Sequence, residues 1–214
     1  MQTREAAGLE SLVRLDRAHV RPASAMLARS FRDYPLLAYV VPDATRRERE
    51  AFYFCQYDLY YGFRYGEVYA TSPQMEGVAV WVPSDYLPMT TARILGAVPW
   101  SVTCGFGRRV GRKLLGPGRH IDARHAALAP FPHLFLSLLG VAPEERGQGH
   151  AGALLRPMFA RLDAHGLPCY LETMDERNVA RYEHFGFRVL EQSAVPCTSL
   201  TSWAMLRGDS LPAK

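Results

Sequence analysis

The chain has 214 residues, of which 48% are apolar and 21% are charged. This length and composition predict one ordinary globular domain and exclude a fibrous or disordered protein. The net charge of +4 is mild, so it allows an anionic ligand without indicating a nucleic-acid partner. No apolar run approaches the roughly 18 residues of a membrane span, and the polar start lacks the apolar segment of a signal peptide. We therefore expect a cytoplasmic protein without a membrane partner.

The first part of the chain predicts a strand, two helices and a hairpin. Residues 10–17 are typical of a strand, and residues 20–31 of a helix that ends before Pro35, because a residue preceding proline leaves the helical region. Residues 44–64 predict the longest helix, capped by Asp43 or Thr45. Residues 67–71 and 77–83 are β-rich runs joined by a polar turn, which predicts a β-hairpin.

Residues 84–131 contain scattered glycines and prolines and short helical pieces such as 120–128, and we interpret them as an insertion between two strands. Residues 133–141 are nearly all apolar and predict a strand buried on both faces. A helix over 149–165, ended by Gly166, follows. The rest predicts strands at 168–173, 186–192 and 199–207 and a helix at 176–184. This order predicts an α/β arrangement around one mixed sheet.

The most informative segment is the glycine-rich turn over residues 141–152, which follows a strand and opens a helix. Glycines let a ligand approach the backbone, and the free N–H groups of the first helical turn carry the positive end of the helix dipole. The pattern Gly147-x-Gly149-x-x-Gly152 matches a dinucleotide site, with Glu172 as the ribose-binding acid. In such a site, however, the strand runs straight into the first glycine. A pyrophosphate of CoA is the alternative ligand.

A second spacing in this turn, Arg146-x-x-Gly149-x-Ala151, is the pyrophosphate signature of the GNAT superfamily of acyl-CoA-dependent N-acetyltransferases. The segment 182–187 (YEHFGF) resembles the closing motif of that family. Segments 133–149, 171–187 and 202–207 resemble its puromycin N-acetyltransferase-like branch, as do residues 33–35 and 78–81. The resemblance covers most of residues 10–207, is clear from 133 to 190 and is weak from 84 to 131.

The resemblance implies a GNAT fold over residues 1–214: a single mixed, mostly antiparallel central sheet flanked by helices. The helical insertion would precede the central strand and border the acceptor site. The implied reaction is direct attack of an amine on the thioester of acetyl-CoA in a ternary complex. The residues implied to bind the cofactor are Leu139, Val141, Arg146, Gly147, Gln148, Gly149, His150, Ala151, Gly152 and Asn178.

Two residues are the candidates for catalysis. Tyr182 is implied to be the general acid, because a phenol is protonated at pH 7 and can donate to a thiolate; the alternative is a packed tyrosine. Glu172 is the candidate base, directly or through water, and it would also contact the substrate. An ion pair or a purely orienting role is the alternative for Glu172. His133 matches a histidine of the branch, where a proton relay and a structural role both remain open.

The acceptor is the least determined part of the prediction. Tyr34 and Tyr57 are candidate substrate-binding residues, with core packing as the alternative for each. A small-molecule amine is the first hypothesis for the acceptor. The alternatives are a protein or peptide amine, transfer to a hydroxyl group, or a CoA-binding protein without turnover. We expect a monomer or homodimer. The four cysteines lie far apart without a CxxC pair, which predicts reduced thiols and no metal site.

Overall fold

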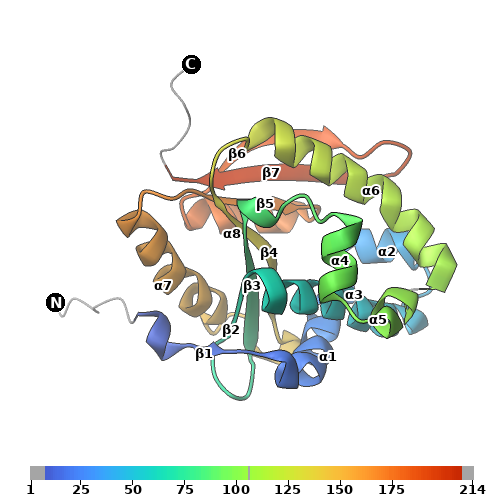
Figure 1. Cartoon of the computed structure of the whole chain (residues 1–214), viewed down its shortest axis with the longest axis horizontal. Coiled ribbons are helices and arrows are strands. Elements are labelled where there is room, and N and C mark those ends of the chain that lie inside the picture. Colours follow the sequence, from blue (N-terminus) through green and yellow to red (C-terminus); the bar gives the residue numbers. More distant parts are fainter. Residues whose placement is uncertain (1–7, 106, 209–214) are drawn as a thin grey trace.

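The computed structural model describes residues 8–105 and 107–208, with the side chains of 107–109 left out. Seven strands form one sheet in the order β1-β2-β3-β4-β5-β7-β6 (Figure 1). Within the described residues, β4 and β5 are the single parallel pair, and the other neighbours run antiparallel. The predicted mixed, mostly antiparallel sheet flanked by helices is confirmed. No helix in the described ranges is long and apolar enough to cross a membrane.

The strands are β1 (Val13–Arg14), β2 (Glu67–Ala70), β3 (Gly77–Pro83), β4 (Leu134–Val141), β5 (Cys169–Thr173), β6 (Arg188–Ala194) and β7 (Thr201–Arg207). The α-helices are α1 (Val20–Phe31), α2 (Pro35–Val40), α3 (Ala44–Tyr65), α4 (Thr91–Ala97), α5 (Trp100–Gly105), α6 (Gly107–Leu128), α7 (His150–Ala164) and α8 (Glu176–His184). Short 3-10 helices occur at η1 (Leu9–Ser11), η2 (Arg17–His19), η3 (Ser84–Tyr86) and η4 (Pro143–Glu145).

The helices cover the two faces of the sheet. One face of β3 packs with α1 and α3 in a core that includes Val80, Leu27 and Leu59. The opposite face packs on α7, with Trp81 and Leu155 at its centre. Helix α6 runs along the end of the sheet formed by β6 and β7 (Figure 1). This arrangement leaves the carboxyl ends of β4 and β5 between the two helical layers.

Most predicted elements occur where the sequence placed them. The helices at 20–31 and 176–184 and the hairpin are confirmed, and Asp43 caps α3 by accepting a hydrogen bond from the Thr45 N–H. Gly166 takes the predicted left-handed conformation, with φ 60°, just after α7. Pro157 lies inside α7.

Four expectations differ in detail from the structure. The first strand has two residues, because residues 9–11 form a 3-10 turn. Pro35 ends the preceding helix as predicted but also begins α2, since proline at the first helical position forfeits only an N–H that would have no helical partner. The insertion contains the 22-residue helix α6, which continues through Pro117, in place of short pieces. Strand β4, predicted to be buried on both faces, alternates between buried and half-buried residues.

Candidate active site

The turn between β4 and α7 has the geometry of an anion cradle. Gly147 and Gly149 have φ of 84° and 88°, a region that residues with a Cβ rarely adopt. The first main-chain bond of α7 joins the Ala153 N–H to the Gly149 carbonyl, at 3.0 Å. The N–H groups of the three preceding residues, 150–152, therefore have no backbone partner within the described chain. An exposed row of free donors at a helix N-terminus binds anions.

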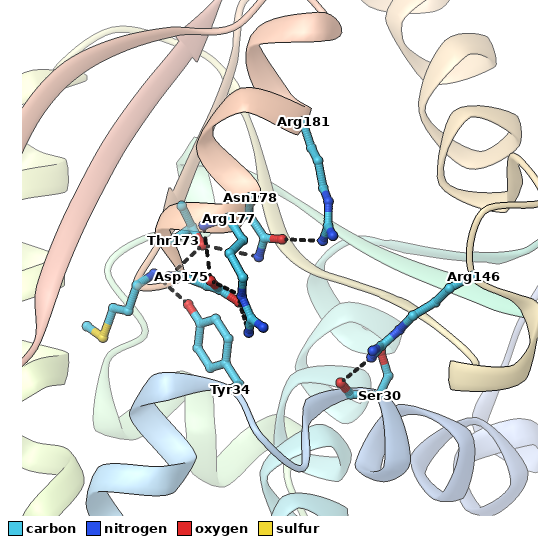
Figure 2. A network of polar contacts seen from close by, with 9 residues as sticks. Ser30, Tyr34, Arg146, Thr173, Asp175, Arg177, Asn178 and Arg181 are labelled. Atoms are coloured by element: carbon cyan, nitrogen blue, oxygen red, sulfur yellow. Dashed lines mark hydrogen bonds and ion pairs between the residues drawn. The ribbon is translucent and has the colours of Figure 1, made fainter.

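The Arg146 side chain connects this turn to helix α1. Its guanidinium donates to the Ser30 carbonyl at 3.0 Å, at the end of α1 (Figure 2). A second link between α1 and the turn is the ion pair of Arg29 with Glu144, at 2.8 Å. Gln148 is exposed, while His150 and Ala151 are half-buried in the first turn of α7. The structure thus brings the predicted residues 146–152 together on one turn, and the Arg146 side chain ties that turn to α1.

Strands β4 and β5 separate at this end of the sheet. They pair only at Leu134 with Cys169 and at Phe135 with Tyr170, although β4 continues for six further residues. Beyond Phe135 the side of β4 that faces β5 has no strand partner among the described residues. A strand edge without a neighbour offers its N–H and C=O groups to an extended ligand.

The register identifies which groups face this opening. Gly77 of β3 directs both its N–H and its C=O to Thr71, away from β4, and the Ala142 N–H donates to the Glu76 carbonyl. Main-chain groups of a strand alternate in direction, so the N–H and C=O of Leu139 and Val141 point away from β3. These residues therefore present donors and acceptors to the opening, where the sequence predicted a cofactor contact.

A bulge in β4 lies beside the same opening. Val80 pairs with Leu138 and Trp81 with Leu136, so Ser137 is the extra residue. After the bulge the alternation reverses: Leu138 packs in the α1–α3 core. The Ser137 hydroxyl donates to the carboxyl of Asp58 on α3 at 2.8 Å. Burial raises the pKa of Asp58 to about 7.

The start of α8 lies across the opening from the glycine turn (Figure 2). Asn178 donates to the Thr173 hydroxyl at 3.5 Å and accepts from Arg181 at 3.0 Å. The Tyr34 hydroxyl accepts a hydrogen bond from the Met174 N–H at 2.8 Å, which joins the turn before α2 to the end of β5. Tyr34 is therefore a structural link at the mouth of the opening, whatever further contact it makes.

Tyr182 is half-buried on α8 and packs edge-on against Phe187, with ring centres 5.7 Å apart. Burial raises the pKa of its phenol above the ordinary value, and the charges of Tyr34 and Cys169 add to this effect. No described residue forms a hydrogen bond with the hydroxyl. Within the described residues the phenol is therefore a protonated donor without an acceptor, which is the state that a general acid needs.

Glu172 is half-buried on β5 and held by two hydroxyl groups. Tyr170 donates to one carboxyl oxygen at 2.7 Å and Ser202 to the other at 3.2 Å. Burial raises the pKa of Glu172 to about 7, against the lowering effect of these two hydrogen bonds. A carboxyl group that titrates near neutral pH is suited to accept a proton.

The candidate acid and base lie on opposite faces of the sheet. Tyr182 packs with Leu171 on the α7 side, whereas Tyr170 packs with Ala129 at the end of α6. Glu172 shares the face of Tyr170, because alternate strand residues point the same way. Glu172 lies two residues beyond Tyr170, the last residue of β5 that pairs with β4.

The candidates Tyr57 and His133 lie beside residues that the sequence did not single out, namely Asp58, Asp122 and His125. Tyr57 is half-buried on α3, and burial together with the charges of Asp58 and Asp122 raises the pKa of its phenol. His133 is buried, with its ring 2.7 Å from His125 and from the Phe131 carbonyl. The sequence did contain a sign that Asp58 is buried: it is a charged residue directly before Leu59, a core residue of the amphipathic helix α3.

Comparisons with known proteins agree with this geometry. A sequence model of the acetyltransferase (GNAT) family matches residues 104–187. An uncharacterized N-acetyltransferase of Schizosaccharomyces pombe is 44% identical over 59 residues. That match covers 28% of this chain and 24% of the yeast protein, about a quarter of its length.

Two solved structures share the fold over nearly the whole chain. A histone acetyltransferase HPA2 and related acetyltransferase of Corynebacterium glutamicum superposes with a TM-score of 0.58 at 19% identity, over 95% of this chain and 98% of that one. A polyamine N-acetyltransferase of Drosophila melanogaster gives a TM-score of 0.59 at 14% identity, over 92% and 99% of the two chains.

Proposed function

We propose that the chain is an acyltransferase of the GNAT type that transfers the acetyl group of acetyl-CoA to an amine of a small molecule, supported by the family model over residues 104–187 and by the shared fold. The observation that carries the proposal is the alignment of the open edge of β4 with the free N-terminus of α7. The open edge of β4 suits an extended, amide-rich arm, and the N-terminus of α7 suits a pyrophosphate. Both groups belong to a single cofactor, acetyl-CoA. The antiparallel sheet argues against the dinucleotide interpretation, which needs a doubly wound parallel sheet.

Each of the cofactor-binding residues has a distinct role in this proposal. The N–H groups of the turn and of α7 bind the pyrophosphate, and the Leu139 and Val141 main chain binds the arm. The Val141 N–H polarises the thioester carbonyl. Asn178 supports the arm from α8. Bound acetyl-CoA supplies an activated acyl group for attack in the ternary complex.

Two side chains move protons in this proposal. Glu172 accepts a proton from the amine, directly or through water, as the N–C bond forms. Tyr182 donates its proton to the departing sulfur as the C–S bond breaks. Tyr57, with the described part of the 84–131 insertion, borders the acceptor. The finer resemblance to the puromycin N-acetyltransferase-like branch supports a small-molecule acceptor, as do the fold neighbours that act on polyamines.

Thermal melting with acetyl-CoA, CoA or NADH in parallel tests the cofactor. Ligand at 100 times its dissociation constant adds about 2.7 kcal/mol, which is about 5–10 °C for a chain of this size. We expect a shift with the two CoA species and none with NADH. Release of free thiol with a panel of amines and alcohols then tests the reaction. A shift with NADH alone would overturn the proposal, and thiol release with alcohols alone would replace the amine by a hydroxyl acceptor.

A further inference from the structure

A cavity lies on the Glu172 side of the sheet. It has a volume of about 400 Å³ and lies between η3, α6 and the start of β4. Asp85 and Asp122 stand at its rim, and His125 and His133 form its floor. None of the described residues that line it is Lys or Arg, in a chain with 25 such residues. The cavity therefore presents a negative rim to any ligand.

The hydrogen bonds at the floor fix the state of the two imidazoles. His133 Nδ1 lies 2.7 Å from the Phe131 carbonyl, which accepts only a donor, so Nδ1 of His133 carries the hydrogen. In the neutral ring Nε2 of His133 is then an acceptor, and His125 Nε2, 2.7 Å away, is its donor. Burial lowers the pKa of both histidines, to about 3 for His125, which keeps the pair uncharged.

His125 is left with an unused acceptor. Its Nδ1 carries a lone pair and has no described hydrogen-bond partner, although the residue is 8% exposed and lines the cavity. Because His125 lines the cavity, this nitrogen can accept a hydrogen bond from a donor that fills it. Ser84 also lines the cavity, and its hydroxyl accepts a hydrogen bond from the His133 main-chain N–H at 3.2 Å.

The rim carboxyl groups have no fixed counterion. Neither Asp85 nor Asp122 takes part in any of the described ion pairs. The guanidinium of Arg93 donates to the main-chain carbonyls of Asp85 and Pro88 and lies over the Tyr86 ring, 5.8 Å from its centre, so none of these contacts is with the Asp85 carboxylate. A cationic group with hydrogen-bond donors would satisfy both the rim and the floor.

The cavity floor is connected to the reaction site through one side chain. The His125 ring lies 4.3 Å from the Tyr170 ring, and the Tyr170 hydroxyl donates to Glu172. Asp122 lines the cavity, and its charge also contributes to the raised pKa of Glu172. A ligand in the cavity is therefore separated from the proposed base by little more than a tyrosine.

We propose that this cavity is the subsite for a second, protonated amino group of the acceptor, so that the preferred substrates are diamines. Asp85 and Asp122 attract the ammonium group, and His125 Nδ1 accepts one of its hydrogens. The other amino group of the same molecule reaches Glu172 and is acetylated. This inference rests on the proposed function and assigns the substrate class to the same site.

The test compares 1,4-diaminobutane with butylamine, which lacks only the second amino group, by thiol release from acetyl-CoA. We expect kcat/KM to favour the diamine by at least tenfold. Asp85→Asn and Asp122→Asn, both at exposed positions, should each reduce this preference by about threefold to fivefold through KM for the diamine. Glu48→Gln removes the same charge from the exposed face of α3 outside the cavity and should leave the preference unchanged. Melting temperatures check that each variant is folded.

Equal kcat/KM for the two amines would overturn the subsite and leave the acetyltransferase proposal standing. A preference that both Asp variants retain would also overturn it. Absence of thiol release with every amine would count against the proposed function instead. In that case calorimetric titration of 1,4-diaminobutane into the CoA-loaded protein, with and without Asp122→Asn, decides the subsite: binding weakened by the substitution supports it, and no binding rejects it.

Discussion

The two ends of the proposed site are built from different parts of the chain. The cofactor end consists of main-chain groups on one continuous segment, from β4 through the glycine turn into α7. The acceptor end consists of side chains from α3, α6, β4 and β5, which include Asp58, Asp122 and Glu172. A main-chain site depends on conformation, so glycine positions control it. A side-chain site depends on burial and charge, so single functional groups control it.

We expect the largest effect from a substitution at Glu172, in the acceptor end. Glu172→Gln should lower kcat/KM by about 100-fold or more, a usual contribution of general base catalysis, with little change in acetyl-CoA affinity. In the unmodified protein the rate should rise with pH through about 7, because only the ionised carboxylate accepts a proton. The variant should lose this dependence. A pH–rate profile measured beside Glu48→Gln tests this, and an unchanged profile would assign Glu172 an orienting role.

Tyr182→Phe removes one oxygen from the opposite face of the sheet. We expect kcat to fall about 100-fold with the melting temperature unchanged, because the hydroxyl has no hydrogen-bond partner among the described residues. Tyr34→Phe is the matched comparison. It leaves the Met174 N–H without its partner, which costs about 1–3 kcal/mol of stability if that group stays dry. Melting and steady-state kinetics on both variants separate the roles, and equal rates for Tyr182→Phe and the parent would exclude a general acid.

Gly149→Ala tests the cofactor end, which is built from main-chain groups. The φ of 88° strains an alanine by about 1–2 kcal/mol, so the turn should relax and acetyl-CoA affinity should fall about tenfold. Gly166→Ala places the same strain at the far end of α7, where φ is 60°. It should lower the melting temperature without changing acetyl-CoA affinity. Calorimetric titration of both variants measures the difference, and equal affinities would remove the turn from the cofactor site.

The smallest effect concerns Asp58 and stability. Its pKa is about 7 in the folded protein and near 3.8 when unfolded, so the folded state binds more protons between these values. Stability from this group therefore falls as pH rises from about 4 to 7. Asp58→Asn keeps an acceptor for Ser137 and removes the charge. We expect its melting temperature to exceed that of the parent at pH 8 and to match it near pH 4. A lower value at pH 8 would contradict the assignment.

The sequence predicted the conformation of the glycine turn and the helix that follows it, because the signals for both are local. A strand, two glycines and a capped helix follow one another in order, and each depends on backbone preferences within a few residues. Leu139 and Val141 were selected by resemblance, and the register gives a separate reason for them: their main-chain groups face the opening. The bulge at Ser137 had no local signal, because it arises from pairing with β3.

The acceptor end could not be assembled from the sequence. Helix α6 looked like short pieces, because glycines and Pro117 obscured its pattern, although packing on the sheet stabilises it. Asp58, Asp122 and His125 lie on separate helices, and nothing local brings them near Glu172. The predicted burial of β4 on both faces failed because every second residue from Phe135 to Val141 is only half-buried, including Phe135, which still pairs with β5.

The sequence by itself determined the order of most elements and the glycine turn, since these follow from local conformational preference, and with the family resemblance it nominated Tyr182 and Glu172 as candidate acid and base. Only the tertiary structure decided that β4 and β5 separate, that Tyr182 and Glu172 lie on opposite faces, and that a cavity with a negative rim adjoins the base. Those features depend on contacts between residues far apart in the chain, and burial, which shifts the pKa of Glu172 and Asp58 towards 7, exists only once those contacts have formed.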